Sequence, residues 1–220
     1  MGYRGLPGGL TYAYQKSAGV EVKLPWHFTA RAVGFHHSYV NQRDALQSRD
    51  DISLDQINEK NDKGQAYGLE LLVQRKLVQR VSATLSYTLA RSELGSTLRA
   101  GVSAMALPSR PNLFDRTHVL QLASAVDLGR MWFASLRGLL YTGWPDLVRD
   151  ERLPAFFRLD ARLEKRWKIR KTGHIALIFE GLNVTGSQEV LSRRCPKTGP
   201  CENVKFGPIT VPSIGVEGAL

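Results

Sequence analysis

Five charged residues recur at every second position in one stretch of the chain: Arg158, Asp160, Arg162, Glu164 and Arg166. The positions that alternate with them carry Phe157, Leu159, Ala161, Leu163, Lys165 and Trp167. A period of two is that of a β-strand, so the five charges share one face and the mainly apolar residues share the other. Charges at this spacing can pair within the strand and with neighbouring strands, where Glu180 and Arg137 are the expected partners. Structural pairing is the favoured role, and guidance of an anionic ligand is the alternative.

The only two cysteines, Cys195 and Cys201, lie close together in the segment RRCPKTGPCEN. A structural zinc site would need a second cysteine pair or nearby histidines, and the sequence around them has neither. A short disulfide-closed loop in an oxidising compartment fits the spacing better. Two free thiols are the alternative.

Other residues of catalytic or metal-binding type do not form a recognisable site. His36 and His37 are adjacent, so on a strand they face opposite sides and are poorly placed to bind one ion. An acid-rich segment with Asp50, Asp51 and Asp55 lacks the spacing of a calcium loop and also contains basic residues. No nucleophile, zinc-protease or phosphate-loop motif occurs. The sequence therefore predicts neither an enzyme nor a protein with a metal or another cofactor.

The 220 residues carry a formal net charge of +10, which by itself favours an anionic partner. The basic residues are spread along the chain and often alternate with acids, without a basic block or an RNA-binding motif. We therefore expect no nucleic-acid partner. No apolar run approaches the roughly 18 residues of a membrane helix. The start, MGYRGLPGGL, does not resemble an export signal, so a membrane-barrel interpretation implies a missing N-terminal part.

Period-two alternation predicts about nine strands, several of them long. They are expected at 14–24, 28–40, 65–75, 81–89, 117–127, 131–142, 157–167, 174–182 and 209–220. Strands of soluble proteins are usually about 5–6 residues long, whereas about 9–11 residues cross a bilayer at a tilt. The length of these strands therefore favours membrane-crossing segments.

The predicted connections alternate between short and long. Short turns are expected at Pro25-Trp26, 76–79, 128–130 and 168–172, and longer loops at 41–63, 92–114, 143–153 and 183–208. Outer-membrane barrels have short periplasmic turns and long extracellular loops. The predicted fold is all-β: part of an antiparallel transmembrane β-barrel, with about 9–10 strands in this chain. A soluble sandwich or a lipocalin-like barrel is the alternative.

Several segments resemble, in order, the late barrel strands of TonB-dependent outer-membrane receptors. They are GQAYGLELLVQRKL (64–77), VSATLSYTLARSE (81–93), RPNLFDRTHVLQLA (110–123), LLYTGWP (139–145), RLPAFFRLDARLEKRWKI (152–169), FEGLNVTGSQEV (179–190) and VPSIGVEGAL (211–220). Each motif is degenerate alone, and together they cover most of the chain after position 64. Two features depart from the family: the chain ends in Leu220 rather than an aromatic residue, and a complete receptor has about 22 strands.

The resemblance implies that residues 1–220 form the C-terminal part of such a receptor barrel in the Gram-negative outer membrane, without a plug domain. It further implies TonB-dependent uptake of a scarce, large ligand such as a siderophore, cobalamin or an oligosaccharide. The partners would be outer-membrane lipid and, through a plug domain, the TonB complex. The ligand and its contact residues cannot be identified from the sequence. The alternative is a small stand-alone outer-membrane barrel with a structural or adhesive role.

Overall fold

The computed structural model describes residues 12–42, 61–100, 103–106, 109–146, 151–169, 173–196 and 198–219. Within these ranges the chain is almost entirely β-strand, and all strand pairs are antiparallel. The predicted all-β antiparallel class is confirmed. No helix in the described part of the chain is long and apolar enough to span a membrane.

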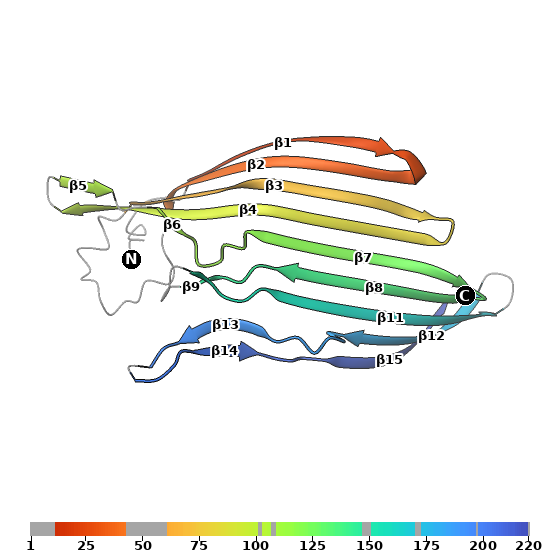
Figure 1. Ribbon diagram of the computed structural model, residues 1–220. Helices are drawn as coiled ribbons and strands as arrows, with labels where there is room; N and C mark the ends of the chain where they lie inside the picture. The colour runs from red at the N-terminus through yellow and green to blue at the C-terminus, as the bar shows by residue number, and fades with distance from the viewer. Residues whose placement is uncertain are drawn as a thin grey trace, which may run out of the picture.

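Nine long strands form the main sheet, each pairing with the next long strand along the chain (Figure 1). In sheet order they are β1 (Tyr12–Leu24), β2 (Phe28–Gln42), β3 (Asn61–Val78), β4 (Val81–Ala100), β7 (His118–Gly129), β8 (Trp132–Tyr141), β11 (Phe156–Ile169), β12 (Gly173–Leu182) and β15 (Val211–Ala219). Each overlaps one of the nine strands expected from the alternation.

Short turns gather at one end of the sheet, on the right of Figure 1. The 3-10 turn η1 (Pro25–His27) joins β1 to β2. Residues 79–80 and 130–131 make the next two turns, with positive φ at both positions of each, as in type I′ hairpins. The predicted turns at 76–79 and 128–130 begin three and two residues too early. The reason is that β3 continues through a bulge to Val78 and β7 continues to Gly129. The end of β15 lies on this side too, since Ala219 pairs with His174.

The opposite end carries the long connections, and these contain short strands that the alternation did not predict. They are β5 (Ser103–Ala106), β6 (Arg110–Pro111), β9 (Pro145–Asp146), β10 (Glu151–Arg152), β13 (Glu189–Arg194) and β14 (Glu202–Phe206). The loops expected at 92–114, 143–153 and 183–208 are therefore partly hairpins. The loop expected at 41–63, with Asp50, Asp51 and Asp55, lies largely outside the described residues.

One face of the main sheet, called here the apolar face, is exposed along all nine strands. Cross-strand partners keep the same side from strand to strand, as in the pairs Leu85–Leu122 and Leu163–Phe179. Exposed large apolar residues on this face include Val20, Val22, Leu69, Leu71, Leu85, Leu89, Leu122, Leu136, Leu140, Phe157, Leu163, Trp167, Ile175, Phe179, Ile214 and Val216. Exposure reaches 73% at Ile214 and 74% at Val216. No second layer of described residues covers this face.

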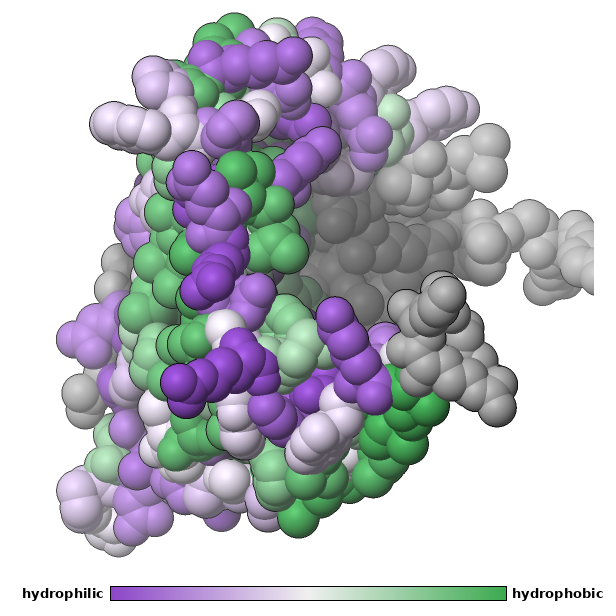
Figure 2. All heavy atoms as spheres, turned by 90° about the vertical axis from the view of Figure 1, so that its right-hand side faces the viewer, coloured by the Kyte–Doolittle hydropathy of each residue, from purple (hydrophilic) through white to green (hydrophobic). Residues whose placement is uncertain are grey.

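The other face, called here the polar face, is the more buried one. Asp160, Glu164 and Ala176 on this face are all buried. Figure 2 looks along the strands from the short-turn end and shows the described residues curved around a hollow that is open on one side. Strands β1 and β15 form the two edges of the sheet and do not pair with each other. The described sheet is therefore curved but not a closed barrel.

Candidate functional site

The five charges of β11 form a ladder on the polar face, in two hydrogen-bonded groups. Arg162 donates to Glu164 at 3.0 Å, and Arg166 also donates to Glu164. Arg158 donates through Nη2 to Asp160 at 3.2 Å. The side chains of the two acids, Asp160 and Glu164, are only 9% and 7% exposed. The charged residues alternate in sign at every second position of β11, as the sequence shows. Asp160 therefore accepts from one arginine and Glu164 from two.

The ladder extends to the next strands through Arg162. Its Nη1 donates to Glu180 of β12 at 2.8 Å, and its Nη2 lies 3.9 Å from Glu217 of β15. Arg137 of β8 lies opposite Asp160 in the register, and no ion pair is recorded for it among the described residues. Glu180 therefore has the expected contact, and Arg137 is adjacent without the expected ion pair.

A hollow of about 340 Å³ lies beside the ladder on the polar face. Its floor comes from small residues of neighbouring strands, such as Ser82, Ala123 and Ser135. Arg137 and Arg162 line the same hollow. Asp160 and Glu180 line it as well, so the hollow offers polar groups and charges of both signs, but its lining shows no nucleophile with an adjacent base.

Asn183 fixes the end of the ladder, and the strand pattern alone did not identify this role. It is 4% exposed and has a φ of 52°, a conformation that asparagine tolerates better than most residues. Its backbone N–H donates to Asp160 at 2.8 Å, and its side-chain amide donates to the carbonyls of Ser187 and Ile209. The signal in the sequence was the turn-type segment Asn-Val-Thr-Gly after a strand.

Asp115 connects separate segments at the loop end of the sheet, and its side chain is 1% exposed. It accepts the backbone N–H of Ser92 at 2.6 Å and forms an ion pair with Arg152. Arg152 also donates to the carbonyls of Asp115 and Gly143, at 2.9 and 3.2 Å. The contact joins segments 37 residues apart, so no local sequence pattern could have identified it.

The two cysteines form a disulfide, Cys195–Cys201, at the tip of the β13–β14 hairpin. Ion pairs fasten this hairpin to neighbouring segments, one at its base and one near its tip. Glu189 pairs with Arg116 at 3.1 Å, and Arg193 pairs with Asp146 at 3.1 Å. The hairpin is therefore a braced structure at the loop end of the sheet.

Aromatic residues near the ends of the strands lie in different surroundings. Trp167 lies on the apolar face and is 47% exposed, and Trp26 lies in a short turn with 80% exposure. Tyr141 lies on the polar face, is 6% exposed and is covered by the Arg116 guanidinium 3.7 Å from its ring centre. Trp144 also lies near Arg116, at 5.3 Å. Both rings stabilise Arg116 at the loop end.

The described residues bring together no group of three histidine, cysteine or acidic side chains that could hold a metal ion. His36 stacks near Tyr67 on one side of β2, and His37 lies near Phe35 on the other. The charged ladder and its hollow are thus the main polar feature inside the curve of the sheet. Comparison with protein-family models, curated proteins and solved structures finds no match to this chain.

Proposed function

We propose that the chain forms part of a transmembrane β-barrel in a Gram-negative outer membrane, with the apolar face against lipid and the charge ladder on the inner side. The observation that carries this proposal is the exposed apolar face, which continues over all nine strands. Monomeric soluble proteins rarely expose apolar patches above about 300–600 Å². A soluble sandwich would need a second layer on this face, and the described residues provide none.

The height of the apolar face supports the proposal. On β4 the apolar positions run from Val81 to Leu89, which is nine residues. At about 3.3 Å per residue these span roughly 30 Å along the strand, close to the thickness of a bilayer core. The ladder acids would avoid hydrocarbon, because their side chains lie on the opposite face.

The unpaired edges of β1 and β15 support a larger assembly. Backbone N–H and C=O groups cannot remain without partners in hydrocarbon, so a sheet in a membrane must close on itself. Single-chain bacterial barrels usually have an even number of strands, and the described residues contribute nine long strands to this sheet. Both features favour further strands over a small stand-alone barrel.

The resemblance to TonB-dependent receptors supports uptake of a scarce, large ligand as the function of the complete barrel. In this proposal the braced β13–β14 hairpin and the neighbouring loops form part of the outer mouth. A plug domain outside this chain would occupy the lumen beside the ladder and would connect the barrel to the TonB complex. The ladder then has a structural role and keeps the lumen wall polar and rigid.

Two neighbouring residues of β8 give a direct test of the two faces. Both native cysteines are in the disulfide, so one introduced cysteine is the only free thiol. In the complete barrel reconstituted into phosphatidylcholine vesicles, we expect a membrane-impermeant maleimide to label Arg137→Cys and to leave Leu136→Cys unlabelled. Both variants should react equally in urea, which controls for intrinsic reactivity. Equal labelling in vesicles would contradict the membrane proposal.

Whether ligand uptake depends on the proton gradient distinguishes a transport function from the structural or adhesive alternative. Bacteria that carry the gene should take up a siderophore, cobalamin or an oligosaccharide through it, and a protonophore should stop that uptake. Deletion of the gene should abolish the same uptake. If deletion changes surface attachment and leaves all three uptakes intact, the adhesive function is correct instead.

A further inference from the structure

A row of basic and aromatic residues crosses the apolar face near its loop end. Lys16 of β1 pairs with His36 of β2, His36 pairs with Tyr67 of β3, and Tyr67 pairs with Arg91 of β4. Strands lie about 4.8 Å apart, so the row is about 14 Å wide. The rings of His36 and Tyr67 are stacked, with centres 6.4 Å apart.

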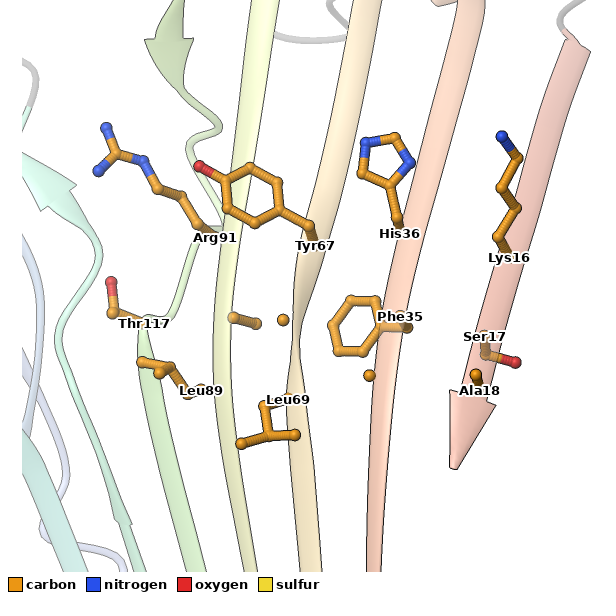
Figure 3. Close-up of a pocket in the computed structure, with 13 residues that line it drawn as sticks. Lys16, Ser17, Ala18, Phe35, His36, Tyr67, Leu69, Leu89, Arg91 and Thr117 are labelled. Atoms are coloured by element: carbon orange, nitrogen blue, oxygen red, sulfur yellow. The ribbon is translucent and has the colours of Figure 1, made fainter. Parts of the chain in front are cut away.

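Directly beneath the row is an apolar groove of about 790 Å³ (Figure 3). The next residues along the strands form it: Ala18, Gly34, Leu69 and Leu89. Ala18 and Gly34 pair with each other, and their small size leaves the depression between the larger neighbours. The volume is in the range of small-molecule pockets, about 300–1,000 Å³.

Both cations of this row, Lys16 and Arg91, are exposed. The structure records no ion pair for Lys16 among the described residues. Arg91 donates its Nε to Glu93 at 2.6 Å, yet its side chain is 58% exposed. Glu93 also accepts from Gln65 at 2.9 Å and from Ser109 at 3.3 Å, so its carboxylate is shared among three donors.

The basic side chains of the row point away from the apolar residues of the groove. In Figure 3 the side chains of Lys16 and His36 and the guanidinium of Arg91 extend toward the loop end, away from Leu69 and Leu89. Long basic side chains at a membrane border extend in this way to reach the headgroup region.

We propose that the row Lys16, His36, Tyr67 and Arg91, with the groove beneath it, is a binding site for a phosphate-bearing anionic lipid. The phosphate contacts the Arg91 guanidinium and the Lys16 ammonium, because arginine matches the geometry of phosphate oxygens and lysine adds a point charge. An acyl chain lies in the groove over Ala18 and Gly34. This inference rests on the proposed membrane location, since it places the apolar face in lipid.

The test measures lipid preference in membranes. The complete barrel is reconstituted into phosphatidylcholine vesicles that contain a trace of spin-labelled phosphatidic acid or spin-labelled phosphatidylcholine. The immobilised fraction of each probe gives their relative association. We expect phosphatidic acid to be preferred about tenfold, which corresponds to about 1.4 kcal/mol. The double variant Lys16→Gln/Arg91→Gln should lose most of this preference, whereas Lys16→Arg/Arg91→Lys should keep it.

A matched control removes two other exposed lysines near the short-turn end, as Lys23→Gln/Lys76→Gln. This control should retain the preference, because general attraction by net charge would respond equally to both double variants. Equal loss in both, or no loss in Lys16→Gln/Arg91→Gln, would overturn the lipid site and leave the membrane proposal intact. Displacement of the lipid by inorganic phosphate would show a free-anion site and would also overturn it. If neither probe is immobilised by the wild-type chain, the proposed function fails as well.

Discussion

Leu122→Arg is expected to destabilise the complete barrel in a bilayer. Leu122 lies at the middle of the apolar positions of β7 and is 42% exposed on the apolar face. An arginine on the lipid face of a barrel costs about 2–4 kcal/mol at the bilayer midplane. We expect the free energy of unfolding in phosphatidylcholine vesicles, measured by urea titration, to fall by that amount.

The adjacent residue on the same strand provides the control. Gln121→Arg introduces the same charge one position away, but Gln121 lies on the polar face and is exposed. Its effect should stay within about 0.5 kcal/mol, as for most exposed substitutions. If Leu122→Arg is tolerated as well as Gln121→Arg, the apolar face does not contact lipid.

Glu164→Ala is expected to cause the largest loss of stability within the charge ladder. Its carboxylate accepts from both Arg162 and Arg166, and its side chain is 7% exposed. Removal of one partner from a buried ion pair costs about 3–5 kcal/mol, because the remaining charges lose their compensation. We expect about 3 kcal/mol, at the lower end of that range, since the two arginines are about a third exposed and can be hydrated.

The control for this variant is Glu180→Gln. Glu180 also pairs with Arg162, at 2.8 Å, but its side chain is 40% exposed. Arg162 would keep Glu164, so the expected loss is below about 1 kcal/mol. Urea unfolding of both variants in the same vesicles measures the difference. If the two losses are equal, Glu164 is not the centre of the ladder.

The nine long strands were predictable because each alternates between two environments. In β4, for example, Leu85, Tyr87 and Leu89 alternate with Ser86 and Thr88, and the structure keeps these sets on opposite faces. The same reasoning placed the charges of β11 together. Alternation does not fix where a strand ends, and bulges displaced the predicted turns by two or three residues.

The loop end was less predictable, since its order comes from contacts between distant residues. The short hairpin β13–β14 lies in a polar segment without clean alternation, and its pairing is interrupted by a bulge near Val190. Asp115 reaches Arg152 across 37 residues, and Arg116 packs on Tyr141. Such contacts depend on the three-dimensional path of the chain rather than on local spacing.

The order of the sheet has a consequence for how it forms. Because every long strand pairs with the next long strand along the chain, its hydrogen bonds join segments that are near in sequence. Contacts of this kind form quickly, so the sheet can grow one hairpin at a time. In the proposed barrel, the one pairing that closes the sheet would join strands far apart in the chain, so it would carry the entropy cost of closing a long loop. We therefore expect this closing step to be the slowest step of assembly.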